Sequence, residues 1–171
     1  MHIDRYERQY LIAVAAVLGL FFAALVASAL VFGVRLPQPE GYINPLTLNR
    51  TVFANPGMRN MGNGVYDAYI VARMWAFDAG SDEKDERGQD VLRVPVGSTV
   101  NFYLTSADVT HGFIVERHNA NIEVLPGHVG RASTRFNEPG TFYIQCHEYC
   151  GRGHQNMYIK IIVEPAGGSA A

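Results

Sequence analysis

The stretch TFYIQCHEYCGRGHQNMYIKIIVE, residues 141–164, holds two β-type runs on either side of a short polar loop. The first run, TFYIQC (141–146), and the second, MYIKIIVE (157–164), are rich in β-branched and aromatic residues. This composition is typical of β-strands. We therefore expect one strand to lead into the loop and another to leave it, with both cysteines of the chain at or inside the loop.

Six similar runs lie upstream, and turn residues such as Gly97, Pro126-Gly127 and Pro139-Gly140 separate several of the runs. The six are VYDAYIVARMWAF (65–77), VLRVPV (91–96), TVNFYLTS (99–106), GFIVE (112–116), NIEVL (121–125) and RASTRF (131–136). Many short strands without a helical run between them predict a mainly-β sandwich or barrel. We place this domain at residues 65–165.

Residues 11–34, LIAVAAVLGLFFAALVASALVFGV, contain no charged side chain. As a helix they would be roughly 36 Å long, enough to cross a hydrocarbon core of about 30 Å. We expect a transmembrane helix over 10–35. The alternative is a secretory signal peptide, for which Ala27-Ser28-Ala29 offers a cleavage pattern, but the apolar run is longer than such peptides need.

Positive charge around this helix is only slightly asymmetric, with Arg5 and Arg8 before it and Arg35 after it. That bias favours a cytoplasmic N-terminus, residues 1–9, with everything after the helix outside. Residues 36–64 are rich in Pro, Gly and Asn and are expected to form a linker, and residues 166–171 a flexible tail.

The segment AGSDEKDERGQD (79–90) is strongly charged. Its simplest interpretation is a solvated hairpin loop. The functional alternative is part of a docking rim for a basic partner, which would include some of Asp82, Glu83, Asp85 and Glu86. The chain as a whole has a formal net charge of -2, which gives no electrostatic basis for nucleic-acid binding.

Two thiols, an imidazole and a thioether fall within residues 146–157, namely Cys146, Cys150, His154 and Met157. Soft sulfur donors with imidazole favour copper over magnesium or calcium. His111, far upstream, supplies a second imidazole. One blue-copper centre needs only one cysteine, whereas two cysteines in one loop can bridge two copper ions. A disulfide, a structural zinc site and a core methionine are the alternatives for these residues.

The loop resembles the signature C-x-E-x-C-G-x-x-H-x-x-M of subunit II of haem–copper cytochrome c oxidases, which it matches in full. LTSADVTHGF (104–113) and Leu125-Pro126-Gly127 are also similar to that family, and the resemblance covers residues 65–164. It implies a cupredoxin-like Greek-key barrel with one N-terminal transmembrane helix, as in the short subunit II of B-type oxidases.

The resemblance also implies a ligand set for a dinuclear CuA centre. Cys146 and Cys150 would bridge both coppers, His111 and Met157 would complete one, and His154 with the Glu148 carbonyl would complete the other. The Glu148 side chain matches a residue that in many members helps to bind magnesium at the border with subunit I.

Trp75 matches the first residue of the family's aromatic electron-input run, although a strand tryptophan more often serves packing. Glu7 resembles a carboxylate at the cytoplasmic mouth of a proton channel in related oxidases, and a solvated glutamate is the equal alternative. His118, His128 and His147 fall outside the motif and are expected at the surface or beside the site.

The implied function is to accept electrons from cytochrome c or a similar small redox protein and pass them to haem in subunit I for oxygen reduction. The expected location is the cell membrane of a prokaryote, with the CuA domain on the outer side. Two other protein classes are rival interpretations. Quinol oxidase subunit II shares the fold but lacks the copper ligands, and nitrous oxide reductase, which also carries CuA, has a longer chain and a different loop. A membrane-anchored copper carrier is the alternative outside an oxidase.

Overall fold

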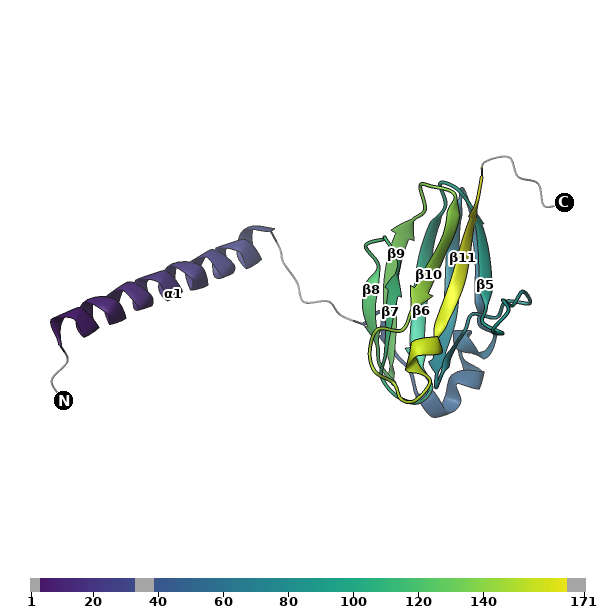
Figure 1. Cartoon of the computed structure of the whole chain (residues 1–171), viewed down its shortest axis with the longest axis horizontal. Helices are drawn as coiled ribbons and strands as arrows, with labels where there is room; N and C mark the ends of the chain where they lie inside the picture. Colours follow the sequence, from purple (N-terminus) through teal and green to yellow (C-terminus); the bar gives the residue numbers. More distant parts are fainter. Residues whose placement is uncertain (1–3, 33–38, 166–171) are drawn as a thin grey trace. The chain divides into compact units, whose positions relative to one another are not determined.

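The computed structural model describes residues 4–32 and 39–165, and the chain divides into two compact units at Gln38/Pro39. The first unit is an α-helix and the second is a β-domain (Figure 1). The tail expected over 166–171 and the residues 1–3 and 33–38 lie outside the described residues.

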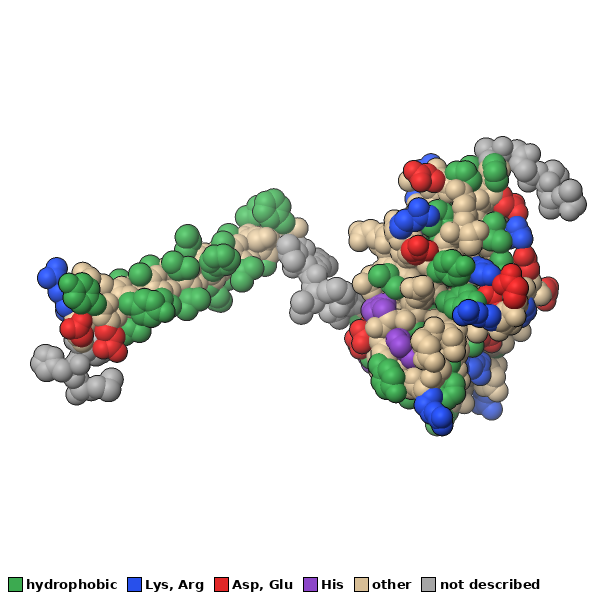
Figure 2. Space-filling view, in the orientation of Figure 1, with side chains coloured by type: hydrophobic (Ala, Val, Ile, Leu, Met, Phe, Trp, Pro, Cys, Tyr) green, Lys and Arg blue, Asp and Glu red, His purple; other side chains and the backbone are tan. Residues whose placement is uncertain are grey.

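The helix α1 spans Arg5–Phe32 and is long and apolar enough to cross a membrane. It begins where the Asp4 carboxylate accepts a hydrogen bond from the Tyr6 N–H at 2.8 Å, which satisfies one of the free amides of the first turn. Apolar side chains cover it on the side seen in Figure 2, and none of its residues is buried within its unit. A helix that exposes apolar side chains in this way requires an apolar solvent such as lipid.

The β-domain consists of two sheets, which confirms the mainly-β prediction. One sheet has the order β1-β9-β6-β3-β2, with β4 paired to β3, and the other has the order β5-β11-β10-β7-β8. The strands of the first sheet are β1 (Gly41–Tyr42), β2 (Gly57–Gly62), β3 (Val65–Arg73), β4 (Ala76–Asp78), β6 (Thr99–Ser106) and β9 (His128–Arg135). Those of the second are β5 (Val91–Pro95), β7 (His111–Val115), β8 (Asn121–Val124), β10 (Gly140–Gln145) and β11 (Tyr158–Glu164). The expected barrel therefore takes the form of a two-sheet sandwich.

All eight predicted runs contain strands, and one of them differs in detail. The run 65–77 is not one strand: β3 and β4 form a hairpin in which Arg73 pairs with Ala76. Met74 and Trp75 make the turn between them. Trp75 is consequently a turn residue at the end of the sandwich rather than a strand residue.

The segment expected as a linker is also different. From Pro39 onward it belongs to the β-domain: β1 pairs with β9 and β2 pairs with β3. Between them lie two 3₁₀ helices, η1 (Pro45–Arg50) and η2 (Val52–Ala54). Leu48 and Phe53 are buried against Val71 on the outer face of the first sheet. The segment shows no periodicity because it is made of short turns that bury only these two side chains.

The core lies between the sheets and is built by alternation along the strands. In β11, every second side chain is buried, so that Ile159, Ile161 and Val163 point inward. Phe113 contacts Phe77 and Phe102, with ring centroids 5.9 and 5.1 Å apart. The same buried cluster includes three residues predicted to bind copper, namely Cys146, Cys150 and Met157.

The charged loop 79–90 is folded onto the second sheet. Glu83 pairs with Arg93 at 2.7 Å, and Lys160 pairs with Asp85 at 3.2 Å and with Glu86 at 3.1 Å. Three of the four carboxylates expected in a docking rim are therefore already paired within the domain. Asp82 has no ion pair among the described residues.

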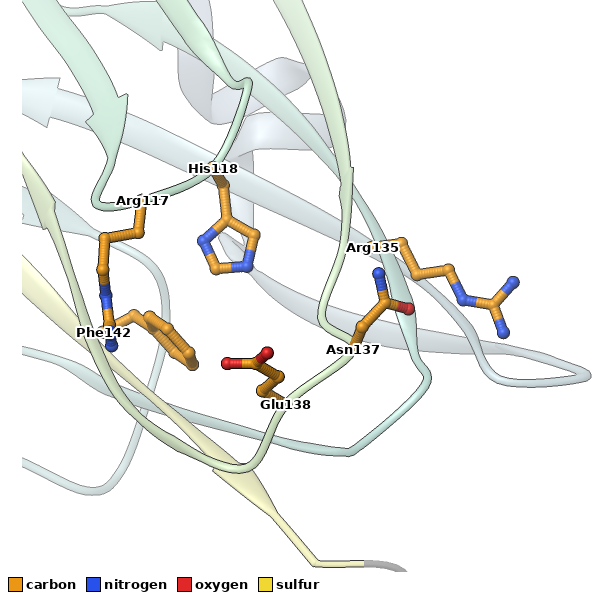
Figure 3. A pocket seen from close by; sticks show the side chains of 6 residues that line it. All are labelled: Arg117, His118, Arg135, Asn137, Glu138 and Phe142. Atoms are coloured by element: carbon orange, nitrogen blue, oxygen red, sulfur yellow. The ribbon is translucent and has the colours of Figure 1, made fainter.

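Two of the histidines outside the copper motif, His118 and His128, pack against aromatic rings. His118 packs between Phe136 and Phe142 beside a cavity of about 240 Å³ at the turn after β7 (Figure 3). His128 packs on Tyr42 with a centroid separation of 5.1 Å. Both are partly exposed.

Candidate metal centre

Strand order brings the predicted ligands to one end of the second sheet. β10 lies between β7 and β11. His111 is the first residue of β7, Cys146 follows β10 directly, and Met157 immediately precedes β11. Residues far apart in the sequence thus meet because antiparallel neighbours place the start of one strand beside the end of the next.

The loop from Cys146 to Met157 is closed at its neck and tightened inside. The Cys146 N–H donates to the Met157 carbonyl at 3.1 Å, and the His154 N–H donates to the Gly151 carbonyl at 3.1 Å. The short helix η3 (His154–Asn156) follows, and Gly151 adopts a φ of +118°, which favours glycine. The ligands are therefore held by a compact loop with its own hydrogen bonds.

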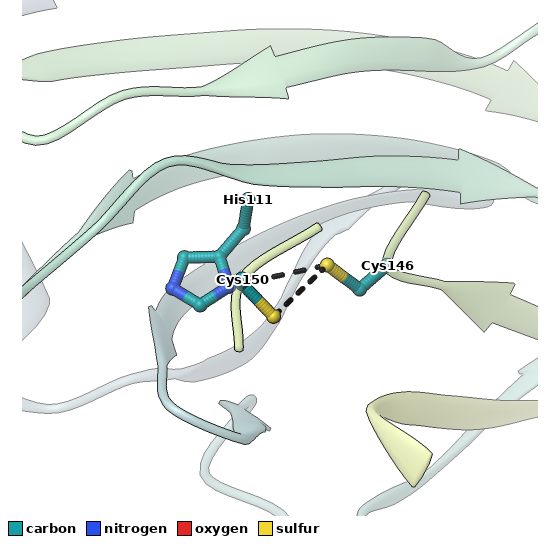
Figure 4. Close-up of side chains that lie close together, drawn as sticks. All are labelled: His111, Cys146 and Cys150. Carbon is teal, nitrogen blue, oxygen red and sulfur yellow. Dashed lines mark hydrogen bonds between the residues drawn. The ribbon is translucent and has the colours of Figure 1, made fainter. Parts of the chain in front are cut away.

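The two sulfurs and the His111 imidazole form the centre of the cluster (Figure 4). Cys146 Sγ lies 3.7 Å from Cys150 Sγ and 3.9 Å from His111 Nδ1. The sulfur–sulfur distance is well beyond the about 2.05 Å of a disulfide, and both cysteines are free thiols. The arrangement is that of converging ligands and not of a covalent cross-link.

The other three predicted ligands surround the same pair of sulfurs. The Glu148 carbonyl oxygen is 3.3 Å from Cys146 Sγ, His154 Nδ1 is 3.7 Å from Cys150 Sγ, and Met157 Sδ is 3.8 Å from Cys150 Sγ. The structure therefore brings all six sequence-predicted ligand residues together. A cavity of about 210 Å³ reaches Cys146, His154 and Met157 from the surface.

The thiols of the metal-free site ionise unequally. Burial disfavours thiolate at Cys146, but hydrogen bonds with His111 and the Gly112 backbone outweigh it and lower the pKa of this thiol. Burial and the neighbouring Cys146 sulfur raise the pKa of Cys150. One thiolate is thus favoured in the pair and a second is not. A metal cation that binds both sulfurs as thiolates must therefore release the proton of the other thiol.

His111 is fully buried, and its ring orientation is fixed from the side away from the sulfurs. His111 Nε2 lies 2.9 Å from Asp108 Oδ1, which leaves Nδ1 facing Cys146. Burial opposes a charged imidazolium, yet the contacts with Cys146 and Asp108 raise the pKa of His111. Sequence reasoning assigned no role to Asp108, although its position three residues before His111 was a usable signal.

This donor set fits copper. Two thiols, two imidazoles and a thioether are soft or intermediate ligands of the kind that select copper. A tetrahedral zinc site would use the two cysteines and two histidines and would leave the thioether without a role. Met157 is only 2% exposed and its sulfur faces the thiols, which agrees with a copper ligand.

Trp75 covers the same loop from the other sheet. Its indole Nε1 donates to the Cys150 carbonyl at 3.1 Å, and the side chain is 39% exposed. The ring lies so close to Gly151 and Gly153 that a Cβ on either would fall 2.9 or 2.6 Å from it. The predicted electron-input residue is thus in contact with a ligand-bearing peptide and with solvent.

The remaining predicted residues lie at the periphery. The Glu148 side chain is half exposed, with Oε1 3.5 Å from His147 Nδ1. His147 lies beside the site, where its ring leaves no space for a Cβ at Gly112. Glu7 is exposed in the first turn of α1.

Comparison with known proteins agrees with this geometry. The family model "Cytochrome C oxidase subunit II, periplasmic domain" matches residues 52–165. One cytochrome c oxidase subunit 2 of Thermus thermophilus is 34% identical over 165 residues, covering 93% of this chain and 92% of that protein. A second subunit 2 of Thermus thermophilus is 40% identical over 103 residues, covering 60% of this chain and 69% of that protein.

Solved structures show the same fold. A chain of a haem–copper terminal oxidase dimer superposes with a TM-score of 0.63 at 34% identity, covering 94% of this chain and 100% of that chain. The periplasmic domain of subunit II of the Bradyrhizobium japonicum cytochrome oxidase gives a TM-score of 0.50 at 26% identity, covering 58% of this chain and 84% of that one. Together with the family match over residues 52–165 and the converging ligand set, these similarities establish that the chain belongs to the cytochrome c oxidase subunit II family.

Proposed function

We propose that this chain is the electron-input subunit of a haem–copper terminal oxidase and that its copper centre is dinuclear. The observation that supports this most directly is the convergence of two thiols, two imidazoles, a thioether and a carbonyl beneath a half-exposed tryptophan. One copper ion would not need six donors, because a blue-copper centre uses four.

Each ligand has a place in this proposal. Cys146 and Cys150 would hold both coppers, His111 and Met157 would be the further ligands of one, and His154 with the Glu148 carbonyl would be those of the other. When bound, a thiolate-bridged copper pair takes up and releases one electron. The chain's own residues hold the donors in place, since the sulfurs belong to the packed core.

The proposed route of electrons begins at Trp75. A small one-electron donor such as cytochrome c docks over its exposed face, outside the membrane. The indole N–H on the Cys150 carbonyl then connects the docking surface to a bridging ligand through one hydrogen bond. Electrons leave towards haem in subunit I, which carries out the reduction of oxygen.

The membrane arrangement follows from the helix. We propose that α1 anchors the chain in the cell membrane of a prokaryote, with residues 1–9 in the cytoplasm and the β-domain outside. In this arrangement the transmembrane segment would extend over 10–35 and the domain would end at residue 165. Glu148 as a magnesium ligand with subunit I, and Glu7 at a proton channel, are further parts of this proposal.

The test is copper stoichiometry and EPR spectroscopy of the purified full-length chain. We expect two coppers per chain and a hyperfine pattern from one electron shared over both nuclei. One copper per chain with a mononuclear spectrum would instead favour a membrane-anchored copper carrier.

A further inference from the structure

The carboxylate of Asp108 makes contacts in two directions. Its Oδ1 lies 2.9 Å from His111 Nε2 and accepts from the Val109 N–H at 2.7 Å. Its Oδ2 accepts from the Met74 N–H at 2.7 Å. Both oxygens are therefore engaged, in a side chain that is 27% exposed.

These contacts join the two sheets of the sandwich at the copper end. Met74 is in the turn between β3 and β4 of the first sheet, and His111 begins β7 of the second sheet. Trp75 follows Met74 directly. Its indole is tied to the Cys150 carbonyl, so the turn is fixed twice, by its backbone at Asp108 and by its side chain at Cys150.

We propose that Asp108 is a positioning residue that sets the orientation of the His111 ring and the place of the Trp75 indole together. This inference rests on the proposed copper function, in which one residue is a ligand and the other the point of electron input. A carboxylate suits the task because it offers an acceptor oxygen to each of two donors. Hydrogen bonds to a metal-bound histidine fix its tautomer and its orientation.

A purely local role for Asp108 predicts something else. If the carboxylate only shaped its own loop through the Val109 N–H, its removal would affect neither the turn at Trp75 nor the retention of copper. The two arms are separable because an amide has one acceptor oxygen and two donor hydrogens. When His111 Nδ1 binds a metal ion, Nε2 carries the proton and acts as a donor, so Asp108→Asn can then keep one contact and must lose the other.

The first experiment uses the metal-free full-length chain in detergent. Trp75 is the sole tryptophan, so fluorescence reports on the turn alone. In Asp108→Ala we expect a red-shifted emission and an acrylamide quenching constant about twofold higher, because a freed indole leaves its contact with the loop. The matched control is Asp67→Ala, which removes a carboxylate that accepts from Asn101 Nδ2 at 2.8 Å within the first sheet. Its emission should equal that of the wild type.

The second experiment measures Cu(I) affinity by competition with a colorimetric chelator. Asp108→Ala should weaken copper retention by about 10- to 100-fold, as is usual when the partner of a metal-bound histidine is removed. Asp108→Asn should show only one of the two effects. Far-UV circular dichroism checks the fold of each variant, and Asp108→Asn provides the test if Asp108→Ala does not fold.

The outcomes separate this inference from the proposed function. Wild-type fluorescence or wild-type copper affinity in a folded Asp108→Ala would overturn the joint role of Asp108, and so would both effects or neither in Asp108→Asn. A wild-type chain that binds no copper would refute the proposed function while leaving the fluorescence result to be judged by itself.

Discussion

The indole Nε1 of Trp75 donates a hydrogen bond of 3.1 Å to the carbonyl oxygen of Cys150. The two residues are 75 positions apart, one in a turn of the first sheet and the other in a loop of the second. Their contact links an exposed aromatic face to the peptide that carries a proposed copper-binding thiol. Several expectations for experiment start from this pair.

Replacing Trp75 should slow electron input without disturbing the copper site. Trp75→Phe keeps an aromatic ring and removes the N–H donor, whereas Trp75→Ala removes both, so the rate should fall in that order. Stopped-flow reduction by a cytochrome c measures the rate, and the EPR spectrum serves as the internal control. Tyr149→Ala, at an 80% exposed residue of the same loop, is the matched surface control. Transfer at the wild-type rate in Trp75→Ala would show that the side chain serves packing only.

Gly153→Ala should displace the indole by steric contact. The added Cβ would lie 2.6 Å from Trp75 Cγ and Cδ2, closer than such atoms approach, so the ring must move. We expect a red-shifted tryptophan emission and a loss of about 1–3 kcal/mol of folding free energy. Gly41→Ala is the control, since no atom lies within 4 Å of its Cβ position. An unchanged emission spectrum would mean that the loop yields in place of the ring.

Both cysteines should be required for the EPR hyperfine pattern of one electron shared over two copper nuclei. Cys146→Ser or Cys150→Ser removes a bridging thiolate, so the shared-electron pattern should disappear and leave a mononuclear centre or none. Met157→Leu should be milder, because a thioether is a weak ligand, with copper retained at a shifted potential. EPR spectra and copper content decide between these outcomes. A serine variant with the wild-type spectrum would rule out bridging.

Acid should destabilise the β-domain through the folded charged loop. The hydrogen bond from Tyr158, with others from Lys160 and the loop backbone, lowers the pKa of Asp85, whose side chain is only 2% exposed. Because the folded-state pKa lies below the unfolded value of about 4, the unfolded state binds more protons. The stabilisation is therefore present above about pH 4 and is lost as the pH falls below it.

Asp85→Asn provides the test of this acid dependence. Denaturant unfolding at a series of pH values should show lower stability at neutral pH and a flatter decline on acidification. Asp82→Asn, at a carboxylate without an ion pair in the described domain, is the control and should follow the wild-type curve. Parallel curves for wild type and Asp85→Asn would refute the assignment.

The rim of a donor-docking surface should depend on Asp82 more than on its neighbours. Glu83, Asp85 and Glu86 are paired with Arg93 and Lys160, whereas Asp82 is exposed and has no ion pair among the described residues. Asp82→Asn should therefore reduce the ionic-strength dependence of association with a basic cytochrome more than Glu83→Gln does. The measurement is the second-order rate constant at several salt concentrations. The reverse order would place the rim elsewhere.

The strands could be predicted because they depend on local sequence, and five of the six proposed ligands could be grouped because they share one loop. Alternation in runs such as 157–164 reflects which side chains face the core, and the spacing from Cys146 to Met157 reflects the size of one loop. The structure of segment 39–64 was harder to predict. Leu48 and Phe53 are buried by short 3₁₀ turns, which produce no regular spacing of apolar residues in the sequence. The turn at Met74-Trp75 was missed for another reason: both neighbouring strands are apolar, so the run reads as continuous. The role of Asp108 was missed because its second partner, Met74, is 34 residues away in sequence and is brought beside it only by the packing of the two sheets.

Cys146, Cys150 and Met157 are at once proposed copper ligands and members of the hydrophobic core. A substitution at such a residue affects metal binding and core packing at the same time. A cavity created nearby, for example at Ile144 or Ile159, loosens the sulfur positions as well as lowering stability. Substitutions outside the copper loop should therefore be able to alter the redox behaviour of the oxidase. The residues tolerated at this end of the sandwich are limited by metal binding as much as by packing.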